Sequence, residues 1–116
     1  MRVKHRPITT VQLALSGSYT TIFDANANTD NRVNLTVCND TSTPITFSLW
    51  KVASGDSPGD DNLVVNSRML ADKESYVVLE LIGLVFGPSE TLQGSASVAT
   101  QATVTGGYIE YTRVVS

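Results

Sequence analysis

Apolar and polar residues alternate along two neighbouring segments of the chain, residues 33–38 and 45–50. A period of two puts every second side chain on the same face, so each segment is predicted to be a half-buried strand. Residues 39–44 between them are rich in turn formers, which predicts that the two strands form a hairpin. Phe47 and Leu49 are expected to face the core, and Trp50 is expected to face away from it.

Branched and aromatic residues gather between turn signals in several other segments, which predicts further strands. These segments are residues 8–15, 19–23, 63–70, 75–82, 90–98 and 101–113. The run from Leu79 to Phe86 predicts a strand with a corner at Gly83, and a Gly-Pro turn follows it. Gly106 and Gly107 lie inside the last strand pattern and predict a bulge or bend. Residues 24–31 and 53–62 are polar and are expected to be exposed loops.

About eight short strands, with turns about every eight to twelve residues, predict an all-β fold. The expected architecture is a single-domain antiparallel β-sandwich, jelly-roll-like, with an extended N-terminal arm. Residues 1–15 are predicted to form the arm or an edge strand, and residues 16–116 the sandwich. Within the first segment, residues 1–7 are expected to be an arm that ends at Pro7.

Charge is unevenly distributed along the chain. Eight basic and eleven acidic residues give a formal net charge of −3. Three of the basic residues lie near the N-terminus, so the rest of the chain has five basic against eleven acidic residues, a formal −6. A basic arm on an acidic body predicts contact with an acidic protein surface or a neighbouring copy, or else a solvated terminus. The candidate partner-binding residues are Arg2, Lys4, Arg6, Ile8, Val11, Leu13 and Trp50.

The same composition argues against other classes of partner. An acidic body is a poor surface for nucleic acid, because phosphate binding needs a basic face. No apolar run approaches transmembrane length and none follows the N-terminal basic residues, so neither membrane contact nor a signal peptide is expected. Cys38 is the single cysteine, which excludes an intrachain disulfide, and it is expected to be a small core residue.

Few residues could act in catalysis or bind a metal ion. The series Asp24, Asn26, Asn28 and Asp30 resembles the opening of a calcium loop, but the glycine and glutamate expected later in that loop are missing. A solvated loop is therefore favoured there, and equally for the acidic residues of the 53–62 segment. The chain has one histidine, His5, and its glutamates are scattered along predicted strands, so no nucleophile–base pair is evident. We expect no enzyme activity, no metal and no cofactor.

Aromatic residues offer one further candidate site. A sugar-binding platform is one interpretation of them, because amphipathic rings suit binding surfaces. The favoured interpretation is that Trp50 covers a sandwich edge or an oligomer interface. The residues concerned are Trp50, Tyr19, Tyr76, Tyr108 and Tyr111.

Three segments together resemble the small β-sandwich virion proteins of tailed bacteriophages, among them capsid decoration (cement) proteins. They are residues 33–50, the run Leu81-x-Gly83-Leu84-Val85, and Glu90-Thr91-Leu92 leading to Ala96-Ser97. The resemblance implies a virion structural protein, made in the host cytoplasm, that binds the outer surface of a phage capsid. It would stabilise the expanded shell by bridging major capsid protein subunits, as a homotrimer. The alternatives are a phage tail or head–tail component, or a carbohydrate-binding module.

Overall fold

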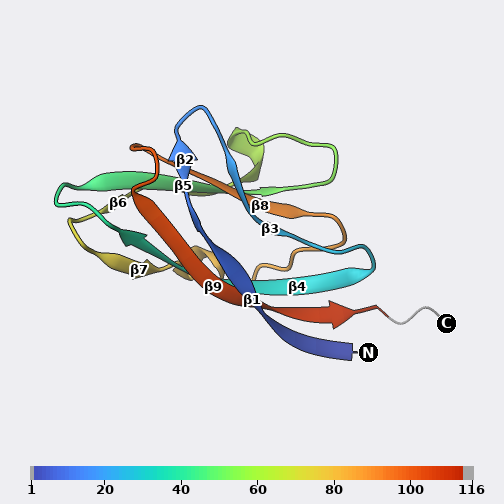
Figure 1. Ribbon diagram of the computed structural model, residues 1–116. Helices are drawn as coiled ribbons and strands as arrows, with labels where there is room; N and C mark the ends of the chain where they lie inside the picture. The colour runs from blue at the N-terminus through green and yellow to red at the C-terminus, as the bar shows by residue number, and fades with distance from the viewer. Residues whose placement is uncertain (1, 114–116) are drawn as a thin grey trace.

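The computed structural model describes residues 2–113, and it confirms the all-β sandwich: two sheets packed face to face (Figure 1). Two short 3₁₀ turns, η1 and η2, interrupt the strands. The elements are β1 (Arg2–Gln12), β2 (Ala14–Leu15), β3 (Thr20–Asp24), β4 (Thr29–Asn39), β5 (Ile45–Val52), η1 (Asp60–Asn62), β6 (Leu63–Leu70), β7 (Ser75–Val77), η2 (Leu79–Leu81), β8 (Thr91–Ala96) and β9 (Ala102–Thr112).

The strand order identifies the sandwich as a jelly roll. The first sheet has the order β1-β9-β4-β7, and the second has the order β2-β8-β5-β6 with β3 also paired to β8. Both β2 and β3 pair with β8, but β2 runs parallel to it at Ser95 and Ala96, whereas β3 runs antiparallel to it over residues 91–94. The pairs β1–β9, β3–β8, β4–β7 and β5–β6 are then nested, first strand with last, which is the jelly-roll arrangement.

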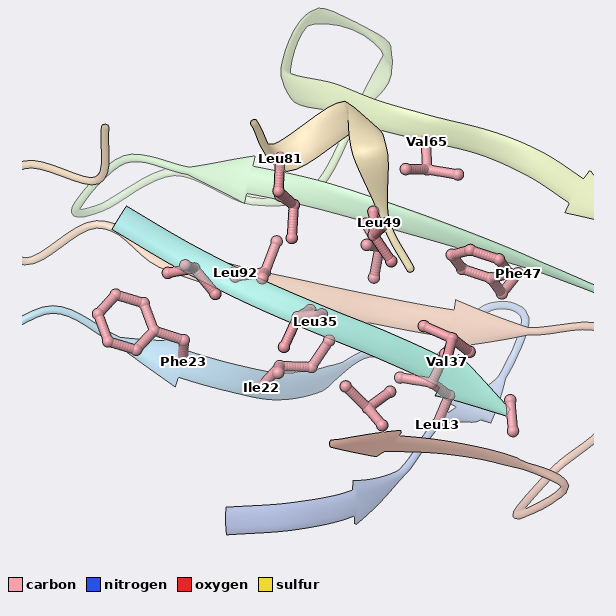
Figure 2. Packing of buried hydrophobic residues seen from close by; sticks show 14 of the residues in the cluster. Leu13, Ile22, Phe23, Leu35, Val37, Phe47, Leu49, Val65, Leu81 and Leu92 are labelled. Atoms are coloured by element: carbon pink, nitrogen blue, oxygen red, sulfur yellow. The ribbon is translucent and has the colours of Figure 1, made fainter. Parts of the chain in front are cut away.

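The core lies between the two sheets (Figure 2). Phe47 and Leu49 of β5 are only 1% and 0% exposed, so the predicted facing of this strand is confirmed. Gly94 of β8 faces the same space, and a Cβ there would lie 2.9 Å from both Leu13 and Leu49. The absence of a side chain at Gly94 therefore allows two leucines to close over the strand.

The hairpin predicted over residues 33–50 is wrong. Both segments are strands, but β4 pairs with β9 and β7 in one sheet, whereas β5 pairs with β6 and β8 in the other. The connection between them is a corner that crosses the sandwich. Asn39, 0% exposed, stabilises this corner by donating to the carbonyls of Thr43 (2.8 Å) and Ala71 (3.0 Å) and accepting from the backbone of Thr41 (2.9 Å).

Of the two alternatives predicted for residues 1–15, the structure shows the edge strand: β1 lies at the edge of its sheet and pairs with β9 from Arg2 to Gln12, so residues 2–7 are not a separate arm. Pro7 does not end the strand. Proline lacks an N–H donor and is tolerated in a strand that lies at the edge of its sheet, as β1 does. After β1 the chain crosses to the second sheet at Leu13, which is fully buried, and β2 begins there.

A bulge lies close to the predicted position, but on the neighbouring strand. The pairing of β1 with β9 shifts between Ile8 and Val11, where residues 9 and 10 face a single residue of β9. The pairing of β9 with β4 is continuous through Gly106 and Gly107. The extra residue is therefore in β1, opposite Thr105 of β9, which lies just before the predicted site at Gly106 and Gly107.

The predicted strand over residues 79–86 is also wrong. Residues 79–81 form η2, and Phe86 makes only an isolated bridge with Asn31. Gly83 does mark a corner, with φ of +84°.

Two further expectations are wrong. Residues 29–31 of the predicted loop belong to β4. Cys38 is not in the core: it is half-buried on the outer face of β4, while its neighbour Val37 is in the core.

Candidate binding surfaces

The basic residues of β1 form a stripe on one face of the strand. Alternate residues share a face, so Arg2, Lys4 and Arg6 project to the same side as the buried Ile8. The bulge at residues 9 and 10 changes the alternation, and the half-buried Val11 therefore faces inward again. All the candidate partner residues predicted in β1 thus lie on its inner face.

Their exposure divides these candidates into two groups. Ile8 and Leu13 are 7% and 0% exposed and pack in the core of the same chain, so they do not form part of an accessible partner surface. Arg2, Lys4 and Arg6 are exposed, because the second sheet does not cover this end of the first. Figure 1 shows β1 extending away from the body at its N-terminal end. We call Arg2, Lys4 and Arg6 the basic stripe.

The basic stripe borders a cluster of buried polar side chains. Glu110 of β9 is 5% exposed; its carboxylate accepts a hydrogen bond from Asn26 (3.1 Å) and lies 3.8 Å from the Arg6 guanidinium. Directly across from Glu110 in β4 is Asn31, whose amide donates to Thr29 and to the carbonyl of Phe86. In the described residues, Arg2 and Lys4 form no ion pair, so their charges are available to a partner.

A cleft with two aromatic residues lies on the outer face of the second sheet. The rings of Tyr19, from the turn between β2 and β3, and Trp50, from β5, meet edge to face with centroids 5.1 Å apart. Trp50 is half-buried and points away from the core, as predicted. The cleft has a volume of about 310 Å³ and is lined by Ser16, Gly17, Tyr19, Ser48, Trp50, Gly59, Asp60, Leu63, Asn66, Ser67 and Ser95.

The other tyrosines do not join Trp50. Tyr108 packs against Phe23 in the interior (4.6 Å between centroids), and Tyr76 lies beneath the guanidinium of Arg68 (3.9 Å). Tyr111 lines a separate hollow over the first sheet. The predicted sugar platform of one tryptophan and four tyrosines therefore reduces to Trp50 and Tyr19, joined by polar residues that the sequence pattern did not single out.

The acidic residues considered as metal ligands are dispersed. Across residues 2–113, no three His, Cys, Asp or Glu side chains lie close enough together to hold a metal ion. Several carboxylates instead have local partners: Glu80 accepts from the Tyr76 hydroxyl at 2.7 Å, and Glu90 accepts from the backbone of Gly87. The hydrogen bond with Glu80 raises the pKa of Tyr76, because it stabilises the protonated phenol.

Asp30 joins the start of β4 to the residue after β9. Its carboxylate accepts two hydrogen bonds from Arg113, at 2.7 and 3.0 Å. The hydrogen bond with the guanidinium, together with its charge, lowers the pKa of Asp30 below its usual value. A group whose pKa is lowered by folding stabilises the fold above its unfolded pKa, about 3.9, and loses this contribution as pH falls through the lower folded value.

We therefore expect the Asp30 carboxyl to titrate at a lower pH in the native protein than in an Arg113→Gln variant. The variant keeps the length of the side chain but removes the charge. The measurement is an NMR titration of the Asp30 side-chain carbon in both proteins. Equal midpoints would show that the pair does not form in solution.

Four apolar side chains also remain exposed: Met69 (67%) of β6, Val77 (60%) of β7, Leu79 (59%) of η2 and Ile82 (70%) just after it. An ion pair between Arg68 and Glu80 (3.9 Å) joins β6 to η2. Among the described residues there is no helix long and apolar enough to cross a membrane.

Comparisons with known proteins give structural likeness alone. No protein-family model matches the chain, and no curated protein matches it significantly. The fold is similar to chains of the infectious bursal disease virus T13 particle (14% identical, TM-score 0.45), its VP2 subviral particle (13%, 0.40) and its Gx strain (14%, 0.45).

Those alignments cover 94% of this chain but only 30–32% of the viral chains, so this chain spans about a third of their length. Likeness at these identities and scores says nothing about what the chain binds.

Proposed function

We propose that this chain is a structural protein of a phage virion that binds the outer surface of the capsid through β1 and bridges major capsid protein subunits. The observation that carries the proposal is the combination of an open strand edge with unpaired cations. Within the described structure β1 pairs with β9 alone, so its other edge presents free backbone N–H and C=O groups. Arg2 and Lys4, which belong to the basic stripe, project from this same edge strand.

An open edge and a basic stripe suit docking onto an acidic shell protein. Main-chain hydrogen bonds to an added strand supply affinity, while the charges on the stripe steer association and set the orientation. The jelly roll is a common architecture of viral capsid domains and also of lectins, so the fold is compatible with the proposal without selecting it. A protein with this role needs no catalytic site, and we propose that the chain is not an enzyme.

Self-association would increase the strength of each contact. We propose that the exposed apolar side chains of Met69, Val77, Leu79 and Ile82 are covered in a homotrimer. Linking several weak shell contacts in one trimer raises the overall affinity by about 10²–10⁴ when all can engage together. Light scattering of the purified chain tests the trimer.

Reversing the charge of the basic stripe is expected to weaken capsid binding at least tenfold. The variant is Arg2→Glu with Lys4→Glu, because neither residue forms an ion pair in the described structure. Arg32→Glu is the matched control: Arg32 is exposed on β4 and has no ion pair in the described residues, but it lies outside the stripe. Deleting β1 is a poorer test, since it would remove one of the two strands paired with β9 and the buried Ile8.

The measurement is co-sedimentation with expanded capsids that lack this protein, over a range of salt concentrations. Unchanged binding by the stripe variant, or an equal loss in Arg32→Glu, would contradict docking through β1. Copy number in particles tests the wider proposal. A simple ratio to the major capsid protein indicates a decoration protein, about three to twelve copies indicate a neck or tail component, and absence from particles overturns the virion role.

A further inference from the structure

We propose that the aromatic cleft on the second sheet binds a neutral sugar residue of a glycan. This inference concerns the outer face of the β8-β5-β6 layer, on the opposite side of the core from β1, and it is independent of the proposed virion role. It begins from the chemistry of a pyranose ring, which combines apolar C–H faces with a rim of hydroxyl groups. A site for such a ring needs aromatic surface and converging polar groups together.

The aromatic surface comes from two segments that lie far apart in sequence. Trp50 projects from the outer face of β5, while Tyr19 reaches over it from the turn after β2, and the two ring planes meet at 88°. The resulting corner keeps apolar ring surface accessible, with Tyr19 45% exposed. Exposed rings cost free energy in water, so aromatic groups left at the surface in this way are typical of binding sites.

Polar groups surround this corner on the remaining sides. Asp60 and Asn66 lie on the β6 side of the cleft, and neither side chain is hydrogen-bonded to another described residue. The Ser48 hydroxyl accepts a hydrogen bond from the backbone of Ser67 (2.9 Å), which leaves its own proton free to be donated. The cleft thus presents a carboxylate, an amide and hydroxyl groups, which together can pair with sugar hydroxyls as donors and acceptors.

Two local features, a bulge and a hydrogen-bonded loop, determine the backbone conformation around the cleft. A bulge in β6 places Asn66 and Ser67 opposite the single residue Ser48, and Ser67 adopts φ of +48°, an uncommon conformation for serine. Bulges of this kind redirect side chains and are frequent beside functional sites. In the neighbouring loop, Asn62 accepts from the backbone of Gly59 (2.9 Å) and donates to Ser57 (3.0 Å), which holds η1 and Asp60 in place.

The charge and the volume of the cleft limit the class of ligand that it can bind. No basic side chain lines the cleft in the described structure, and Asp60 contributes a negative charge, so phosphate, sulfate and acidic sugars are disfavoured. A volume of about 310 Å³ is at the lower end of the range of about 300–1,000 Å³ for small-molecule sites. The cleft therefore fits one or two sugar residues at the end or side of a longer chain.

The test is an NMR titration of the full isotope-labelled chain. The probes are neutral oligosaccharides of glucose, galactose, mannose and N-acetylglucosamine, with sialyllactose and a proline-rich peptide as comparisons. At least one neutral oligosaccharide is expected to shift the Trp50 indole N–H and the amides of Ser48, Asn66 and Ser67 at millimolar concentration.

Variants then assign the binding to the cleft. Trp50→Ala and Asp60→Asn are each expected to lower the affinity for that oligosaccharide at least tenfold, while Trp50→Phe retains part of it. Tyr111→Ala is the matched control, because Tyr111 lies on the outer face of the other sheet. The affinity of this variant for the oligosaccharide is expected to be unchanged. Thermal melting reports whether each variant is folded; Asp60 is exposed, so its variant remains informative if Trp50→Ala unfolds.

Four results of the titration would overturn the proposal. They are no shift with any neutral oligosaccharide, shifts confined to residues outside the cleft, tighter binding of sialyllactose than of every neutral probe, and cleft shifts with the peptide alone. Affinity unchanged in folded Asp60→Asn and Trp50→Phe would place the sugar elsewhere and has the same consequence.

Discussion

Replacing Phe47 by alanine is expected to lower the free energy of unfolding by about 3–5 kcal/mol. Phe47 is 1% exposed and lies in the layer between the sheets, with the Tyr76 ring 6.3 Å away between centroids. Removing the ring deletes its buried apolar surface and leaves a cavity that a close-packed core cannot fully collapse. Since domains of this kind are stable by about 5–15 kcal/mol, the loss is a large share of the total.

Urea unfolding followed by tryptophan fluorescence measures this loss, with Trp50 as the probe. The matched control is Val3→Ala on β1, where the side chain is 51% exposed and the expected change is within about 0.5 kcal/mol. A loss below about 1 kcal/mol for Phe47→Ala would mean that β5 faces the other way in solution.

Alternation in sequence predicts which face of a strand is buried, but not which strand lies beside it. The pattern correctly assigned Phe47, Leu49 and Trp50 to their faces, because that property depends on the strand alone. It failed for the connection after β4, because a short polar turn can either reverse the chain within a sheet or cross to the opposite sheet. The difference here depends on Asn39, whose hydrogen bonds reach Ala71, far away in sequence.

The segment after β7 shows a second limit of the pattern. A run of apolar residues predicted a strand over residues 79–86. Instead Val78 and Leu81 are buried with a spacing of three, as in a 3₁₀ turn, and the next buried residue is Phe86. Leu79 and Ile82, between and beyond them, are 59% and 70% exposed. Apolar composition alone does not show which of these residues are buried in the core. Because some apolar residues here are exposed, the spacing of the buried positions is not visible in the sequence.

The two candidate binding surfaces could be predicted from the sequence to different degrees. The basic stripe could be predicted from three cations at alternate positions, but the pairing of their strand, β1, with β9 could not be predicted. For the aromatic cleft, the facing of Trp50 was predictable from alternation, but its contact with Tyr19 and its place in one cleft with Asp60 were not. That contact depends on the turn after β2 and the loop before β6 meeting over β5, which follows from the tertiary fold.

Gly106 is the position where a single added methyl group is expected to disrupt the first sheet. A Cβ at this residue would lie 2.0 Å from the carbonyl oxygen of Asn34 and 3.0 Å from the Cα of Leu35 on β4. Both are backbone atoms of a paired strand, so neither can rotate away as a flexible side chain would. Because β9 lies between β1 and β4, moving it disturbs both of its pairings.

We therefore expect Gly106→Ala to lower the free energy of unfolding by about 3 kcal/mol or more, at the upper end of the usual range for overpacking. Gly55→Ala separates this effect from backbone preference. Gly55 has φ of +84° but no atom within 4 Å of a built Cβ, so its cost is expected to be about 1–2 kcal/mol.

Chemical unfolding of both variants measures the two losses, and amide hydrogen exchange locates them. In Gly106→Ala, protection should fall first in β1 and β9, because β1 depends on β9 for all of its strand pairing in the described structure. The stripe on β1 would then lose its fixed orientation, so the capsid binding that we propose should weaken under conditions in which the second sheet remains folded. Equal losses in the two glycine variants would instead show that β4 and β9 lie farther apart than the close approach requires.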